Sequence, residues 1–200
     1  MLSFHNEANT LQLTITRSDH IQLTPHWSAQ DAYLGQTRLY FIESGRGWLK
    51  IEDTVLDLEP GFVYLIPSRL HFGYGCSGMK KLYFHIRISS VEQRDLLSNI
   101  KNVLKLPYKP EMLQDLLRCY RNTDIYSILR LKMLLQQVIC DFAEAYELPQ
   151  QSIKHYSETV KQAISYIQSA PTLKHTAKSI AAHLFISESK LRNAFKQELD

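Results

Sequence analysis

The spacing of apolar residues changes near residue 90, and this change constrains the fold more than any other feature of the sequence. Before it, apolar and polar residues alternate in short runs, which is typical of half-buried strands. Turn-forming residues, such as those at 44–47 and at Pro60 and Gly61, separate the runs. The pattern predicts an all-β sandwich or barrel over residues 1–90. The expected strands are 11–16, 20–24, 37–43, 48–52, 55–58, 62–66 and 80–88.

From residue 91 onward the apolar spacing is helical. One helix is expected around 111–121, and Asp124 is suited to cap a longer helix with a wide apolar stripe. Such a stripe needs a cover, which is either the 111–121 helix folding back or a second subunit. We expect residues 91–150 to form a helical segment, with a homodimer built through residues 111–146. Residues 148–152 have the character of a linker.

Composition and cysteine use favour a cytoplasmic protein. The 200 residues are enough for one sizeable core, or for one medium domain with a small one. Cys76, Cys119 and Cys140 form no C-x-x-C pair, so reduced thiols are expected and a structural zinc site is not. The first residues do not resemble a signal peptide, and no apolar run approaches the ~20 residues of a membrane helix. No contact with a membrane is therefore expected.

The net charge of +3 is concentrated at one end of the chain. Residues 1–152 carry 16 basic and 16 acidic residues, whereas residues 153–200 carry seven basic and four acidic ones. An anionic partner would therefore meet the C-terminal end. The alternative is a mildly basic, solvated helical surface.

Three helices are expected in this basic region, over 157–169, 175–183 and 187–199. Ser187 is a good N-cap for the last of them, whose Leu191 and Phe195 are four residues apart and face inward. Two helices joined by a short turn form the helix-turn-helix, whose second helix enters the DNA major groove. The polar residues left on the outer face of the last helix are Ser189, Arg192, Asn193 and Lys196.

These outer residues have side chains suited to double-stranded DNA. Arg192 can bridge the two acceptors of guanine, and Asn193 can bridge the donor and acceptor of adenine. Lys196 is better placed for a phosphate, which gives affinity without sequence information. An ordinary helical hairpin with a polar outer face is the alternative.

Residues 179–199 closely resemble the first helix-turn-helix of AraC/XylS-type transcription regulators, with Ser187, Leu191, Phe195 and Lys196 matching in place. Residues 39–47 and 58–67, followed by His71, resemble the cupin-type effector domain of that family. The resemblance narrows residues 1–90 to a cupin-like β-barrel or jelly roll, and it implies an α+β protein with a helical dimerisation segment and a partial DNA-binding domain over 153–200. That family has two helix-turn-helices and this sequence holds one, so weak DNA binding is expected of these 200 residues.

The resemblance also implies a small-molecule effector inside the barrel, and an N-terminal arm over residues 1–10 that closes on it. Barrel mouths combine aromatic rings with a few polar groups. Arginine suits a carboxylate, a phosphate or sugar hydroxyls, and the rings make a sugar a candidate effector. The effector would shift the protein between dimer or domain arrangements. The expected effector-binding residues are His26, Trp27, Arg38, Tyr40, His71, Tyr83 and His85.

Two alternatives compete with the effector-responsive regulator. The first is a metal-dependent cupin enzyme with a helical appendage, in which His26, His71 and His85 would hold the metal. The sequence before Gly45 has no His-x-His pair, so we expect no catalytic metal, no cofactor and no enzymatic activity. The second alternative is a dimerisation or interaction module whose barrel is filled by its own side chains.

Overall fold

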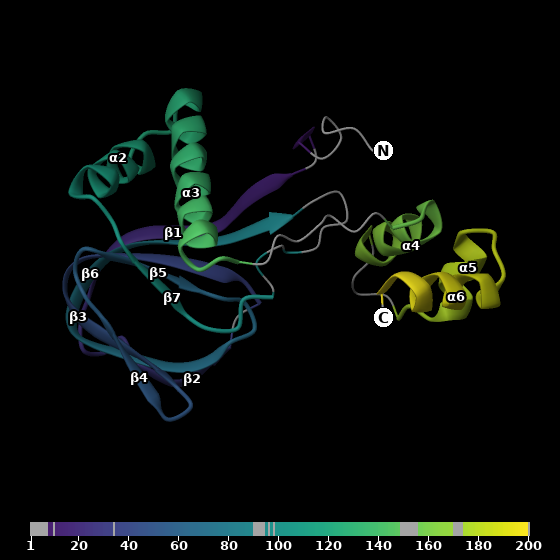
Figure 1. The fold of residues 1–200 in the computed structure, drawn as a ribbon, viewed down its shortest axis with the longest axis horizontal. Coiled ribbons are helices and arrows are strands. Elements are labelled where there is room, and N and C mark those ends of the chain that lie inside the picture. The colour runs from purple at the N-terminus through teal and green to yellow at the C-terminus, as the bar shows by residue number, and fades with distance from the viewer. Residues whose placement is uncertain are drawn as a thin grey trace.

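The fold comes from a computed structural model that describes residues 8–9, 11–33, 35–89, 95, 97, 99–148, 156–169 and 174–199. Its main part is a curved antiparallel sheet of seven strands (Figure 1). Across the sheet, five strands lie side by side in the order β1-β6-β3-β5-β7. In addition, β2 pairs with β6 and β4 pairs with β3. The strands are β1 (Gln12–Leu23), β2 (Ala29–Tyr33), β3 (Thr37–Ile51), β4 (Thr54–Leu58), β5 (Phe62–Ile66), β6 (His71–Ser89) and β7 (Leu104–Pro107).

The two longest strands, β3 and β6, pair along nearly their whole length. Residues 44–47, expected as a turn, lie inside β3, so that prediction is wrong. The register shifts between Ile42 and Ser44 and again between Arg46 and Gly47, so the glycines bend the strand and do not reverse it. Gly45 has a φ of 79°, and a Cβ on it would lie 2.0 Å from the Gly78 carbonyl oxygen of β6.

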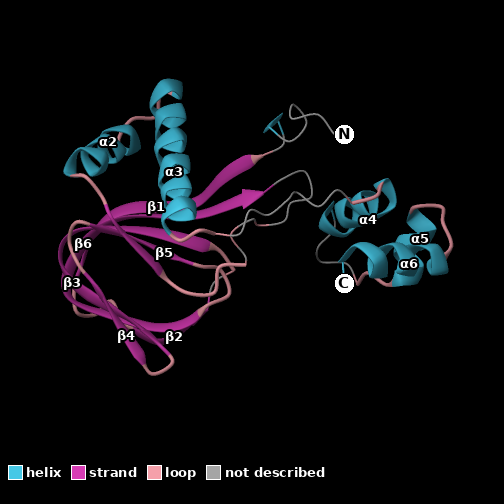
Figure 2. Cartoon of the chain, viewed as in Figure 1, coloured by secondary structure: helices cyan, strands magenta, loops and turns pink. Residues whose placement is uncertain are grey.

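Alternate residues of the strands point to two separate apolar clusters, one on each face of the sheet. On β3, Leu39 and Phe41 face one cluster, and Tyr40 and Ile42 face the other. Two helices, α2 (Pro110–Tyr120) and α3 (Ile125–Ala145), cover the first face (Figure 2). The second face is the inside of the curve, and α2 and α3 do not cover it.

The region after β6 was expected to be helical throughout, which is wrong for residues 104–107. This segment is β7, which pairs with β5 from Leu65↔Leu104 to Phe62↔Pro107. The predicted cap of the long helix is confirmed, because the Asp124 carboxylate accepts hydrogen bonds from the amides of Tyr126 and Ser127.

Three C-terminal helices form an apolar cluster of their own: α4 (Glu158–Ser169), α5 (Ala177–His183) and α6 (Glu188–Leu199). The buried members of this cluster are Ala163, Ile180, Ala181 and Leu191. The expected linker, apart from Leu148, and most of the expected N-terminal arm lie outside the described residues. All three cysteines are free thiols. None of the described helices is long and apolar enough to cross a membrane.

Candidate functional site

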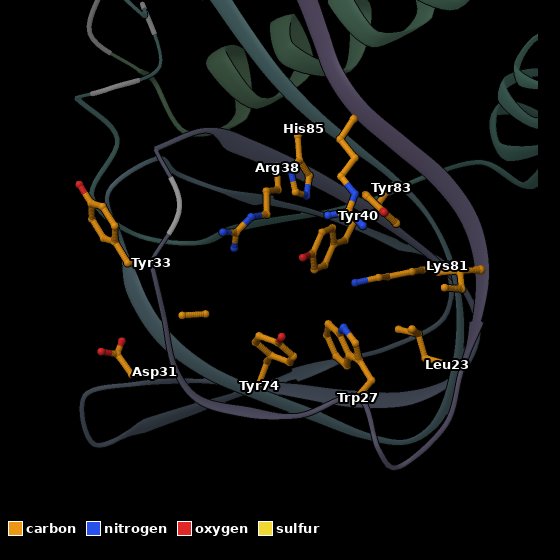
Figure 3. Close-up of a pocket in the computed structure, with 13 residues that line it drawn as sticks. Leu23, Trp27, Asp31, Tyr33, Arg38, Tyr40, Tyr74, Lys81, Tyr83 and His85 are labelled. Carbon is orange, nitrogen blue, oxygen red and sulfur yellow. The ribbon is translucent and has the colours of Figure 1, made fainter. Parts of the chain in front are cut away.

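A cavity of about 530 Å³ lies on the inner face of the sheet, between strands β1, β2, β3 and β6 (Figure 3). Its wall combines aromatic rings with charged side chains. The lining residues are Arg17, Ile21, Leu23, Trp27, Asp31, Ala32, Tyr33, Arg38, Tyr40, Tyr74, Lys81, Tyr83 and His85.

Strand register explains why the central side chains meet there. Arg38 pairs with His85, and Tyr40 pairs with Tyr83, across the β3–β6 ladder. Residues two apart on a strand share a face, so all four point inward, and Lys81 follows the same alternation on β6. The Tyr40 and Tyr83 rings lie 6.1 Å apart in an edge-to-face arrangement.

Arg38 is a buried cation with incomplete pairing. Arg38 is 3% exposed, and its guanidinium carbon lies 4.8 Å from the centre of the Phe72 ring. The nearby Tyr40 hydroxyl favours its charged form, but among the described residues its Nε has no hydrogen-bond partner. Burial lowers the pKa of Arg38 and raises the pKa of Tyr40 to about 12. An arginine stays protonated in proteins, so this wall of the cavity carries a positive charge.

Lys81 is more completely buried, at 2% exposure, and its ammonium points into the cavity (Figure 3). Its Nζ lies 3.4 Å from the centre of the Tyr40 ring, 4.1 Å from that of Trp27 and 5.4 Å from that of Tyr83. Burial, and then the nearby Arg38 charge, hold the pKa of Lys81 well below its usual 10.5. The rings therefore form an aromatic cage around an amine that has been removed from water.

His85 is neutral at pH 7. Burial and the positive charges of Arg38, Arg17 and Lys81 lower its pKa from 6.5 to about 4. It can therefore offer a neutral ring nitrogen to a ligand, as donor or acceptor.

The structure brings together Trp27, Arg38, Tyr40, Tyr83 and His85 from the predicted effector site. The other two histidines, His26 and His71, do not line the cavity and are exposed. His71 lies at the start of β6, where its Nδ1 is 3.0 Å from an Asp31 carboxylate oxygen and its ring packs against Tyr33.

Several lining residues were missed by the sequence interpretation, and Lys81 is the most important of them. Its signal was present, because it continues the two-residue spacing of Tyr83 and His85. Tyr74, Asp31 and Tyr33 were missed because strand β2 and the first half of β6 were not predicted.

A cupin-type metal centre does not fit these residues. His26 and His71 lie outside the cavity, and His85 is surrounded by cations that oppose a second positive charge. Within the described ranges, no three His, Cys, Asp or Glu side chains are grouped closely enough to hold a metal ion.

The second candidate site is the outer face of α6. The predicted DNA-binding residues are all exposed, and Leu191 on the opposite side is buried. A reciprocal capping box between Thr176 and Ser179 begins α5. The Arg192 guanidinium donates to Glu188 Oε1, at 2.9 Å from Nε and 2.6 Å from a terminal nitrogen. The exposed residues, Ser189, Arg192, Asn193 and Lys196, share one face of the helix at spacings of three and four.

A third feature is an apolar stripe on the outside of α3. Ile125, Leu129 and Met133 follow one another at four-residue spacing and are 67%, 58% and 55% exposed. Tyr126 beside them is also exposed, and together they form a contiguous apolar surface along the N-terminal half of the helix.

Searches for family models and for curated relatives found no match to this chain. Solved structures do match it. The apo form of a ToxT variant from Vibrio cholerae is 11% identical, with a TM-score of 0.51 over 94% of this chain and 74% of that chain. ToxT from Vibrio cholerae with a bound unsaturated fatty acid is 10% identical, with a TM-score of 0.49 over 96% and 75%. A cupin superfamily protein from Desulfitobacterium hafniense is 18% identical, with a TM-score of 0.32 over 39% and 78%. The match to the apo ToxT variant shows a shared fold and agrees with the expected α+β class.

Proposed function

We propose that this chain is a DNA-binding transcription regulator of the AraC type, whose inner-sheet cavity binds a small-molecule effector in the cytoplasm. The observation that carries the proposal is the exposed polar face of α6, on a segment that resembles the first helix-turn-helix of that family. The fold shared with ToxT, an AraC-family regulator, supports it. The proposed domains are an effector domain at 1–90, a dimerisation segment at 91–150 and a DNA-binding segment at 153–200.

In this proposal Arg192 and Asn193 read base edges, and Lys196 binds the phosphate backbone. The Arg192–Glu188 ion pair does not oppose this role, because an exposed pair four residues apart on a helix is worth at most about 0.5 kcal/mol. The guanidinium can therefore leave Glu188 for guanine at small cost. Ser189 completes the face that enters the groove.

The sheet itself connects the cavity to the helices that cover its other face. Tyr83 lines the cavity, and Phe84, the next residue on β6, points to the opposite cluster. There Phe84 packs edge-to-face against Tyr120 of α2, with ring centres 6.3 Å apart. An effector that moves β6 would therefore also shift α2 and α3, which are the proposed dimerisation elements.

A homodimer through residues 111–146 is part of the proposal. The apolar stripe of Ile125, Leu129 and Met133 is the surface that a second copy of α3 would bury. A twofold arrangement of two such helices is the simplest way to cover identical stripes. For the effector, a sugar is compatible with the aromatic rings of the cavity.

DNA binding is tested with the full chain and a double-stranded site selected from a random library. Replacing both Arg192 and Asn193 by alanine should weaken binding to the selected site by about 1–3 kcal/mol for each base that α6 no longer reads. Lys196→Ala should weaken binding to all sequences alike and reduce its salt dependence. Fluorescence anisotropy at several salt concentrations measures both effects.

Lys50→Ala is the matched control, since it removes one exposed positive charge on β3, outside the proposed dimerisation segment, and leaves α6 intact. Its affinity for the selected site should be unchanged. Equal affinities of the Arg192/Asn193 double variant and the unchanged chain would remove α6 as the reading helix. A stoichiometric transition metal bound by the purified protein would favour the cupin enzyme instead.

A further inference from the structure

Two cations are buried in the wall of one cavity, and no carboxylate of the described residues balances them. Arg38 and Lys81 are 3% and 2% exposed, and neither takes part in an ion pair with a described residue. Arg17, which also lines the cavity, adds a third positive charge. Buried charges are ordinarily paired, because removing them from water is costly.

The groups around these cations compensate them only in part. Arg38 has the Tyr40 hydroxyl and the face of Phe72, and its Nε is left without a partner among the described residues. Lys81 has three aromatic faces, but within the described part of the chain no carboxylate forms an ion pair with its Nζ. Each cation also raises the electrostatic free energy of the other.

The one acidic residue in the described lining, Asp31, does not neutralise this charge. It is exposed on β2, and its carboxylate is already paired with His71. The cavity is therefore positive in its depth and negative only at its edge. An anion that entered would meet the unpartnered Nε of Arg38, the ammonium of Lys81 and a positive potential.

We propose that the cavity binds a small organic carboxylate, with its charge received by the Arg38 guanidinium and the Lys81 ammonium, and its apolar body packed on the surrounding rings. Trp27 and Tyr74 lie across the cavity from Arg38, and Leu23 adds to the apolar wall beside Lys81 (Figure 3). A neutral sugar would use the rings but would leave both charges uncompensated, so it fits this cavity less well. This inference depends on the proposed function only where it identifies the bound carboxylate as the effector.

Calorimetric titration of the full chain tests the site with probes of matched shape. The carboxylate probes are phenylpropionate, hexanoate and glutarate. Phenylpropionamide and hexanamide are the uncharged counterparts of the first two. Phenyl phosphate tests a different anionic head group, and glucose tests a neutral sugar. We expect at least one carboxylate to bind. Its amide and glucose should each bind about tenfold or more weakly than that carboxylate.

Variants then locate the anion. Arg38→Met and Lys81→Met should each weaken the bound carboxylate by about tenfold or more, which corresponds to about 1.4 kcal/mol. Lys80→Met is the matched control, because Lys80 follows the opposite alternation on β6 and pairs with Glu43, outside the cavity lining. The comparison of acid with amide needs no variant, so it holds even if a substitution prevents folding.

The proposal is overturned if none of the carboxylates binds, if amide and acid bind equally, if glucose or phenyl phosphate alone binds, or if Arg38→Met and Lys81→Met bind as the unchanged chain does. These outcomes are separate from the DNA test. If the chain binds a carboxylate but replacing Arg192 and Asn193 does not change its DNA affinity, the anion site stands and the proposed regulator function does not. If the DNA affinity falls but no carboxylate binds, the regulator function stands and the anion site does not.

Discussion

Arg38 on β3 and His85 on β6 are direct pairing partners, and both side chains line the same cavity. Burial, together with the positive charge of Arg38, lowers the pKa of His85 to about 4. A histidine that is neutral in the folded chain but has an ordinary pKa when unfolded makes stability depend on pH.

This pairing predicts a loss of stability in acid. Between pH 6.5 and about 4 the unfolded chain binds the His85 proton and the folded chain does not, so the free energy of unfolding falls as the pH falls. The contribution of this one group is at most roughly 3 kcal/mol across that window. Urea unfolding at several pH values measures it, and His85→Gln should show a shallower decline. An identical pH slope in the variant would mean that other groups are responsible.

Removing the buried charge of Lys81 should stabilise the ligand-free protein. Lys81→Met keeps the apolar stem inside the Tyr40 and Trp27 cage and deletes the ammonium, so unfolding should require about 1 kcal/mol more at pH 7. Lys80→Met removes a half-exposed ion pair with Glu43 and should change stability by less than about 1 kcal/mol, without a gain. Thermal and urea unfolding compare the two. A large loss of stability in Lys81→Met would show that the ammonium has a strong partner in the folded chain.

Alanine substitutions at Gly45 and Gly61 distinguish the cost of a steric clash from the cost of backbone strain. Gly45→Ala places a Cβ 2.0 Å from the Gly78 carbonyl oxygen at a φ of 79°, so it should cost at least about 3 kcal/mol. Gly61→Ala meets a similar φ of 83° but no described atom within 4 Å, so it should cost only about 1 kcal/mol. Urea unfolding gives both values. Equal losses would indicate that the bend of β3 relaxes around residue 45.

The apolar stripe of α3 predicts a self-association that charge should disrupt. Leu129→Glu or Met133→Glu should weaken dimerisation by about tenfold or more, because an interface would bury an unpaired carboxylate. Gln22→Glu on an exposed position of β1, outside residues 111–146, adds the same charge elsewhere and should leave the mass unchanged. Sedimentation equilibrium measures the mass of each variant. A dimer that survives both substitutions would exclude this stripe as the interface.

Much of the fold was predictable because local chemistry agreed with the final structure. Asp124 caps α3 as its position before an apolar stripe indicated, and the alternating residues of 80–88 form part of β6. The missed segment before them holds Gly73 and Gly75, which have the composition of a loop. In the sheet a Cβ on Gly75 would lie 2.7 Å from the Trp48 ring, so the glycines allow neighbouring groups to approach closely. Such a requirement comes from a distant strand and cannot be read locally.

The candidate site was partly predictable for a similar reason. Tyr83 and His85 were chosen on one strand face, and the same spacing includes Lys81. Lysine is rarely buried without a partner, so its residue type alone argues against an inward position. His71 was expected in the cavity because it follows the second cupin-like segment, but it lies at the start of β6, exposed beside Asp31. Its position depends on the pairing of β2 with β6, which was not predicted.

Among the described residues, every wall of the cavity comes from the stretch between Arg17 and His85, ahead of α2 and the helices that follow it. Ligand selectivity could therefore diversify by substitutions in the sheet alone, while the proposed DNA-binding face of α6 stays as it is. The same separation would make the chain a modular part for engineered biosensors, in which a new inducer is selected without redesigning the operator.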